Sequence, residues 1–215
     1  MGSSLKHIDN LIERYPSLLV CQDEIVRSFY LLEECFQSGG KLLIAGNGGS
    51  AADALHIVGE LMKSFVLPRK LDIGICKSID KYCEHSNYLK QNLQMALPAI
   101  ALVGEVGLTT AYSNDVAPDL VFAQQVLGYG RKGDVFLGIS TSGNSKNIIY
   151  AAEIAKAEGL KVIGLTGAHG SNLATISDVC IQVPEVETFK VQELHLPIYH
   201  ALCMMLENIF FNSES

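Results

Sequence analysis

Two short loops rich in glycine and small polar residues carry the residue types best suited to bind a phosphate group. The first is Gly46-Asn-Gly-Gly-Ser50, and the second is Ser140-Thr-Ser-Gly-Asn-Ser145. Each loop follows a short apolar run and precedes a helical pattern, so each should present backbone N–H groups at the positive end of a helix dipole. The second loop adds hydroxyl groups that can donate to phosphate oxygens. Together the loops predict a site for a small phosphorylated molecule.

Two alternatives for these loops remain open from the residues alone. The first loop has part of the G-x-G-x-x-G pattern of dinucleotide-binding proteins, but position 51 is Ala and no acidic residue ends a strand at the expected distance. Alternatively, the glycines only permit a tight turn between a strand and a helix. The second alternative is weaker for both loops together, because a tight turn does not require four hydroxyl groups.

A predicted helix over 50–64 carries His56 and Glu60, which could act in acid–base chemistry or in metal binding. The two residues are four positions apart, so their side chains lie on one face of the helix. Taken alone, the pair is equally typical of an ordinary surface contact between neighbouring polar side chains.

The last predicted helix, over 188–212, contains Gln192, His195 and His200. Gln192 and His200 are about two turns apart, so they share one flank of the helix. His200 lies among apolar residues, where a histidine is commonly part of the core. Pro197 cannot donate a backbone hydrogen bond, so it should kink or restart the helix.

The elements around these residues alternate between helix and short apolar strand. Strands are predicted at 42–45, 98–103, 134–139, 161–166 and 179–183, and helices at 50–64, 116–128, 144–158, 170–176 and 188–212, after an N-terminal helical region within 1–40 that breaks near Pro16. Such alternation predicts an α/β fold with a five-stranded, parallel, doubly wound sheet in the flavodoxin-like order 2-1-3-4-5. The two loops follow the first and third strands, which are neighbours in this order. They should therefore meet in one crevice.

The segment 66–97 is too long for a simple connection between a helix and a strand. We expect one helix at about 86–96 within it. Cys76, Cys83 and His85 match no standard metal-site spacing. We therefore interpret the segment as an insertion that shapes or covers the crevice, within a single domain that spans 1–215.

Composition limits the classes of function. The chain has 215 residues, of which 48% are hydrophobic and 18% charged, as expected for a globular α/β domain. A net charge of −7 argues against a nucleic-acid partner, which requires clustered basic residues. We find no apolar run long enough to span a membrane and no signal peptide, so we expect a cytoplasmic protein without a membrane partner. The six cysteines lack paired spacing and should be free thiols.

Four motifs occur along the chain in a fixed order. They are Gly46-Asn-Gly-Gly-Ser-Ala-Ala-Asp-Ala-x-His56-x-x-x-Glu60-Leu, Ser113-Asn-Asp115, Gly138-Ile-Ser-Thr-Ser-Gly-Asn-Ser145, and Val191-Gln-Glu-x-His195 through His200. With these motifs the chain resembles the sedoheptulose-7-phosphate isomerases, also called phosphoheptose isomerases, of the sugar-isomerase (SIS) domain superfamily. The resemblance covers about 38–64 and 98–212.

The resemblance implies a homotetramer with active sites at subunit interfaces. It implies substrate and phosphate binding by Asn47, Gly48, Gly49, Ser50, Asp115, Ser140, Thr141, Ser142, Ser145 and Gln192. It also implies a zinc ion held by His56, Glu60, Gln192 and His200. Within that set, Glu60 would be the catalytic base and His200 the catalytic acid.

The reaction expected from the resemblance is the conversion of sedoheptulose 7-phosphate into D-glycero-D-manno-heptose 7-phosphate. Such an aldose–ketose isomerisation moves a proton between C1 and C2 through an enediol. A carboxylate and an imidazole from different helices suit it, and a metal could stabilise the enediolate oxygens. One alternative is the same reaction on another phosphosugar. Another is a non-catalytic SIS protein that binds a protein partner, because one relative of the family binds the bacterial replication initiator.

Three departures from the family pattern lie near the expected site. The stretch Met62-Lys63-Ser64-Phe65 stands where the family commonly has Gly-Arg-Tyr/Phe, the insertion 66–97 is longer than in simple members, and Pro197 is unusual in the last helix. They affect the identity of the substrate more than the fold. The four residues of the expected metal set are all present, which favours an enzyme because a binding scaffold has no physical need for them.

Overall fold

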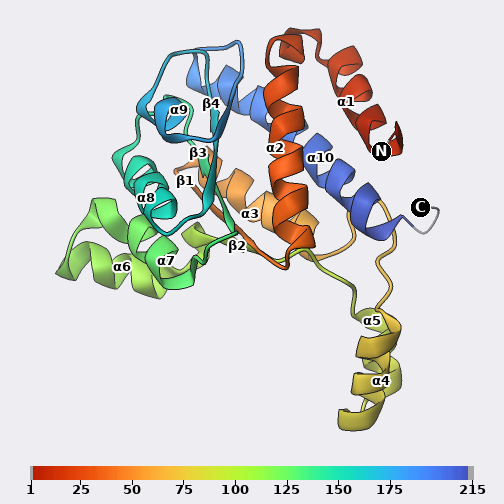
Figure 1. Cartoon of the computed structure of the whole chain (residues 1–215). Coiled ribbons are helices and arrows are strands. Elements are labelled where there is room, and N and C mark those ends of the chain that lie inside the picture. Colours follow the sequence, from red (N-terminus) through yellow and green to blue (C-terminus); the bar gives the residue numbers. More distant parts are fainter. Residues whose placement is uncertain (1, 213–215) are drawn as a thin grey trace.

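A parallel sheet forms the centre of the computed structural model, which describes residues 2–212 (Figure 1). Its strands are β1 (Leu42–Gly46), β2 (Ala99–Ala101), β3 (Val135–Ile139), β4 (Lys161–Thr166) and β5 (Val179–Gln182), in the order β2-β1-β3-β4-β5. The predicted doubly wound sheet is confirmed. β2 is shorter than predicted because the chain turns into a 3-10 helix at Leu102–Gly104.

Successive strand residues point to opposite faces of the sheet, and both faces are buried. In β1, Leu42 and Ile44 join one hydrophobic cluster, whereas Leu43 and Ala45 join the other. This pattern explains why the strands are continuously apolar, and it creates two separate surfaces on which helices pack.

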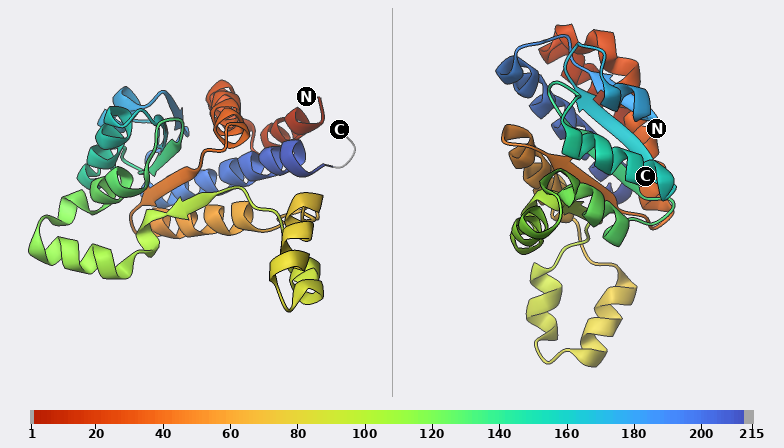
Figure 2. Two further views of the ribbon diagram at one scale, coloured as in Figure 1. Left: turned by 60° about the horizontal axis from the view of Figure 1, so that its bottom comes forward. Right: turned by 90° about the vertical axis from the view of Figure 1, so that its left-hand side faces the viewer.

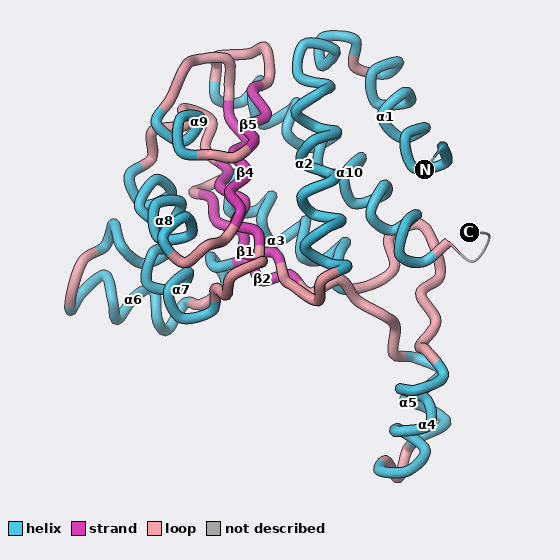
Figure 3. Tube along the Cα trace, in the orientation of Figure 1, coloured by secondary structure: helices cyan, strands magenta, loops and turns pink. Residues whose placement is uncertain are grey.

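Helices cover both faces and give three layers (Figure 3). The first face carries α1 (Gly2–Arg14), the 3-10 helix Pro16–Cys21, α2 (Gln22–Gln37), α3 (Gly49–Met62) and α10 (Thr188–Phe211), and the second carries α7 (Val121–Tyr129), α8 (Lys146–Ala157) and α9 (Asn172–Ile176). The predicted break in the N-terminal region at Pro16 is confirmed, because the 3-10 helix begins there.

The prediction of one helix over 116–128 is wrong in its extent. The structure has α6 at Val106–Asp115, then a 3-10 turn at Pro118–Leu120, and then α7. No residue of α6 is buried, so no apolar periodicity marks this helix in the sequence.

α10 is continuous through Pro197, so the helix is not restarted there. Our expectation that no segment reaches the length of a membrane span also needs correction. Within residues 2–212, α10 is long and apolar enough to cross a membrane, and 56% of its most apolar window is buried in the protein. A helix that packs against several neighbours in a core is apolar for the same reason.

The insertion forms an arm of two helices, α4 (Ile73–Tyr82) and α5 (Ser86–Asn92), which projects away from the sheet and its helices (Figure 2). The expected helix is present as α5, but α4 was not predicted, although Asp72 caps it by accepting the backbone N–H of Ile75 at 2.7 Å. Neither helix has a buried residue. The arm therefore does not cover the crevice of its own chain, contrary to our expectation. The six cysteines are free, as predicted.

Candidate active site

The two glycine-rich loops meet at the carboxyl ends of β1 and β3, where Gly46 pairs with Ile139. They enclose a pocket of about 310 Å³. It is lined by Asn47, Gly48, Gly49, Ser50, Ile139, Ser140, Thr141, Ser145, Thr188 and Gln192. The predicted convergence of the loops on one crevice is confirmed, and eight of the expected binding residues line it.

The pocket presents groups of the kind that bind an anion. α3 begins at Gly49 and α8 begins directly after Ser145, so two helix N-termini open at the pocket. Gly48 has a φ of 56°, a backbone conformation that favours glycine. The hydroxyl of Ser140 donates to Oγ of Ser145 at 3.2 Å, and Ser140 itself is buried. Backbone N–H groups and hydroxyls thus converge without a basic side chain.

Two of the expected binding residues lie outside this pocket. Ser142 is exposed, and its Oγ accepts the backbone N–H of Asn144 at 3.2 Å. Asp115 is exposed at the end of α6, where its Oδ1 accepts a hydrogen bond from the Asn114 amide at 2.8 Å. In a single chain, therefore, these two side chains do not contribute to the pocket.

A second polar cluster lies between α3 and α10. Nε2 of His56 is 3.2 Å from Oε1 of Glu60, and the rings of His56 and His200 meet edge to face with their centroids 5.0 Å apart. Lys63 donates to the second oxygen of Glu60 at 3.3 Å. The carboxylate is largely buried, with 12% of its side chain exposed. The structure thus brings together Glu60, His200 and His56, the expected base, acid and metal ligand. Lys63, in the stretch that differs from the family pattern, adds a positive charge beside them.

Two residues that the sequence analysis did not single out extend this cluster. The Tyr199 hydroxyl donates to Oδ1 of Asp53 at 3.2 Å and lies 3.0 Å from Nδ1 of His56. Burial raises the pKa of Asp53, and the hydrogen bond from Tyr199 partly offsets this increase. Burial, together with the Asp53 carboxylate, also raises the pKa of Tyr199, so the phenol stays protonated. Asp53 could have been identified from the sequence, because it precedes His56 by about one helical turn and so lies on the same face of α3. Tyr199 could not, because it stands in an apolar stretch typical of a helix core.

His200 and His195 have different environments on α10. His195 is buried, its Nε2 lies 3.4 Å from the carbonyl oxygen of Thr166, and burial lowers its pKa to about 4. It is a neutral core histidine. Burial also lowers the pKa of His200; the neighbouring His56 and Arg14 act in the same direction, and the Glu60 carboxylate opposes them. Nε2 of His200 is buried without a hydrogen-bond partner, so it is free to meet a ligand.

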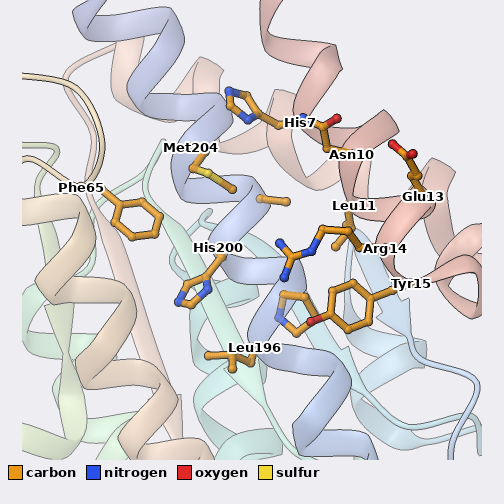
Figure 4. A pocket seen from close by; sticks show the side chains of 12 residues that line it. His7, Asn10, Leu11, Glu13, Arg14, Tyr15, Phe65, Leu196, His200 and Met204 are labelled. Atoms are coloured by element: carbon orange, nitrogen blue, oxygen red, sulfur yellow. The ribbon is translucent and has the colours of Figure 1, made fainter.

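A cavity of about 720 Å³ opens beside His200, between α1 and α10 (Figure 4). Arg14 and Tyr15 line it from the end of α1, and Phe65 lines it from the segment that follows α3. The guanidinium of Arg14 points toward α10, with its central carbon 5.3 Å from the Tyr15 ring centroid. The acid–base cluster therefore has a roomy, open side.

His56, Glu60 and His200 offer nitrogen and oxygen atoms of the kinds that bind zinc, and one distance between them matches the ligand separation of a zinc site. Two ligands of a tetrahedral zinc site are separated by roughly 3.3 Å, close to the 3.2 Å between His56 Nε2 and Glu60 Oε1. The unpartnered Nε2 of His200 would supply a third donor if it moved toward the other two. Gln192 lies instead against Gly49, where an added Cβ would meet its Nε2 at 2.5 Å. As they stand, no three His, Cys, Asp or Glu side chains of residues 2–212 enclose a metal position.

The pocket between the two loops and the cluster of His56, Glu60 and His200 are spaced along the same two helices. His56 lies seven positions after Gly49 on α3, and His200 lies eight positions after Gln192 on α10, which corresponds to about 10–12 Å along each helix axis. An elongated phosphorylated molecule can therefore place its phosphate in the pocket and its far end at Glu60 and His200.

The family model described as SIS domain matches residues 79–167, the part of the chain that contains the hydroxyl-rich loop after the third strand of the sheet. The chain is 40% identical to the phosphoheptose isomerase of Aneurinibacillus thermoaerophilus over 181 residues, which cover 84% of this chain and 79% of that one. It is 37% identical to the Rhodospirillum rubrum enzyme over 188 residues, or 87% of each chain. The solved phosphoheptose isomerase of Neisseria gonorrhoeae superposes with a TM-score of 0.72 at 32% identity, covering 96% of this chain and 94% of that one. The chain belongs to the phosphoheptose isomerase family.

Proposed function

We propose that this protein is an aldose–ketose isomerase that converts sedoheptulose 7-phosphate into D-glycero-D-manno-heptose 7-phosphate. The spacing of the two clusters along α3 and α10 carries the proposal. In a heptose 7-phosphate the phosphate and the reacting C1 and C2 atoms lie at opposite ends of the carbon chain. Binding of the remote phosphate then positions the reacting carbons.

The chain's own residues can move the required proton. The Glu60 carboxylate takes a proton from C1 of the ketose, the electron pair forms the C1=C2 bond, and the C2 oxygen takes a proton from the His200 imidazole. The C1 hydroxyl of the enediol then returns a proton to His200, the C1 carbonyl forms, and C2 takes up the proton held by Glu60, so both residues end in their starting state. The hydrogen bond from Lys63 to Oε2 of Glu60 would help to hold this carboxylate in place.

We propose that His56, Glu60, His200 and Gln192 hold zinc, with Gln192 turning away from Gly49 to reach it. When bound, zinc supplies positive charge that stabilises the enediolate oxygens. Family membership further supports a cytoplasmic homotetramer. Light scattering after size-exclusion chromatography tests the tetramer by its mass.

The experiment is a direct assay of turnover with three phosphosugars of different length. Zinc-supplemented and metal-stripped protein is incubated with sedoheptulose 7-phosphate, fructose 6-phosphate or ribulose 5-phosphate, and the aldose product is identified by NMR. We expect the C7 substrate to react fastest, because only its carbonyl reaches Glu60 while its phosphate occupies the pocket. No turnover of the C7 substrate under either metal condition would contradict the proposal.

A further inference from the structure

Tyr199 is a core residue whose hydroxyl group makes polar contacts. Its side chain lies in the first hydrophobic cluster with 2% of the residue exposed, yet its hydroxyl contacts two polar groups. It donates to Oδ1 of Asp53 at 3.2 Å, and it lies 3.0 Å from Nδ1 of His56. Its ring also meets the His56 ring nearly edge to face, with the centroids 5.5 Å apart. The phenol therefore holds His56 by its ring and by its hydroxyl.

The proton count of this contact fixes which nitrogen of His56 carries a hydrogen. An ionised carboxylate only accepts hydrogen bonds, and a tyrosine hydroxyl has one proton to donate. Since Tyr199 gives its proton to Asp53, the contact with His56 is a hydrogen bond only if Nδ1 of His56 is the donor. Nε2 of neutral His56 is then unprotonated and presents a lone pair.

A second electron-rich atom lies beside that lone pair. Nε2 of His56 lies 3.2 Å from Oε1 of Glu60, and an unprotonated nitrogen this close to an ionised carboxylate is repelled by it. The contact becomes favourable when a cation lies between the two atoms, either a proton or a divalent metal ion. A side chain that forces this tautomer therefore prepares a cation site.

We propose that Tyr199 is a positioning residue that holds His56 as the Nδ1–H tautomer and so makes Nε2 the metal-binding atom. The inference rests on the proposed zinc site of the isomerase. His56 needs such a partner, because 44% of its side chain is exposed to solvent. A hydrogen bond to the far nitrogen of a ligating histidine typically contributes 10–100-fold to metal affinity.

The tautomer is measured first in metal-free protein. Histidine is labelled with ¹⁵N, and long-range ¹H–¹⁵N spectra are recorded at about pH 8.5, where imidazole is ordinarily neutral. We expect Nδ1–H for His56 in the wild type and a mixture with Nε2–H in Tyr199→Phe. In Asp53→Asn the new amide can donate to Tyr199, whose hydroxyl proton then turns to His56, so we expect Nε2–H. An Nε2–H tautomer in the metal-free wild type would overturn the proposal.

Zinc affinity is then measured by competition with a chromophoric chelator. We expect Tyr199→Phe to bind zinc about 10–100-fold more weakly than the wild type. Tyr112→Phe, which removes a hydroxyl from the opposite face of the sheet, should bind zinc like the wild type. Equal affinities for the wild type and Tyr199→Phe would overturn the proposal. If the wild-type protein shows the expected tautomer and zinc affinity but no sugar-phosphate turnover, the proposed function fails and the role of Tyr199 stands.

Discussion

The Arg69 guanidinium donates through Nε to Oε1 of Glu207 at 2.8 Å, and both side chains are buried. The terminal nitrogens of Arg69 donate to the carbonyl oxygens of Glu60 and Leu61, at 2.8 and 2.6 Å, in the last turn of α3. Glu207 lies on α10 about two turns beyond His200. The ion pair thus joins the end of the helix that carries Glu60 to the helix that carries His200.

Glu207 also fixes the chain that leaves α3. Its carboxylate accepts the backbone N–H groups of Phe65, Val66 and Leu67 at 2.7–2.9 Å. Burial alone would raise the pKa of Glu207, but these N–H groups and Arg69 outweigh it and lower the pKa below its ordinary value. A fully hydrogen-bonded buried carboxylate of this kind is sensitive to the loss of its charge.

Glu207→Gln should reduce both stability and turnover. The change leaves the Arg69 charge buried without its partner, which destabilises the fold by about 3–5 kcal/mol. It also loosens the end of α3, so we expect kcat to fall about 10–100-fold through misplacement of Glu60. KM for sedoheptulose 7-phosphate should change little, because the phosphate pocket lies at the other end of both helices. Chemical denaturation and steady-state kinetics measure these effects.

Asp134→Asn is the matched control for this variant. Asp134 is equally buried, and it accepts the backbone N–H groups of Lys41 and Arg131 at 2.9 and 2.8 Å, at the amino end of the sheet. Its loss should lower stability while leaving kcat near the wild-type value. If the two variants lose the same fraction of kcat, the link from Glu207 to Glu60 is not specific.

The stability difference between wild type and Glu207→Gln should depend on pH. The pKa of Glu207 is lower in the folded protein than its ordinary value of 4.5. Its contribution to the free energy of unfolding is therefore complete above pH 4.5 and is lost as the pH falls through the folded value. Urea titrations of both proteins from neutral to acidic pH should show a constant gap that narrows only under acidic conditions. A gap that widens toward acidic pH would contradict this assignment.

Gly49→Ala should weaken substrate binding. An added Cβ would extend from Gly49 toward the present position of Gln192 Nε2, 2.5 Å away, at the lining of the pocket. Whether or not Gln192 has moved to a metal, the added group crowds the loop. We therefore expect KM for sedoheptulose 7-phosphate to rise about 10-fold, the effect of losing one hydrogen bond from the loop to the charged phosphate. Gly59→Ala is the control on the same helix, because its Cβ meets no atom within 4 Å. That variant should keep its KM and gain about 0.4–1 kcal/mol of stability. Equal KM values would refute this role of the loop.

Ser140→Ala tests the second loop. The hydroxyl is buried at the pocket wall and would donate to the phosphate, so its removal should raise KM by about 10-fold or more. Ser38→Ala removes a hydroxyl that donates to the carbonyl oxygen of Glu34 at the end of α2, and its KM should match the wild type. An unchanged KM in Ser140→Ala would mean that the phosphate binds elsewhere.

The sequence predicts those features that depend on local patterns. Continuous apolar runs identify the strands, and the loops after Gly46 and Ile139 could be placed together because parallel strands end at one edge. α6 was missed because it buries nothing and so lacks apolar periodicity. The Arg69–Glu207 pair was also missed, because 138 positions separate two residues that become partners only when α10 packs against α3.

The central claim is that Glu60 moves a proton between C1 and C2, and solvent deuterium incorporation tests it most directly. Sedoheptulose 7-phosphate is incubated in D2O with the wild type or with Glu60→Gln, and the sugar is examined by ¹H NMR. We predict deuterium at C2 of the aldose and at C1 of the recovered ketose with the wild type, because a carboxylate exchanges its proton with solvent. With Glu60→Gln we predict neither product nor exchange. Aldose that forms without deuterium at C2, or turnover that survives in Glu60→Gln, would contradict the mechanism.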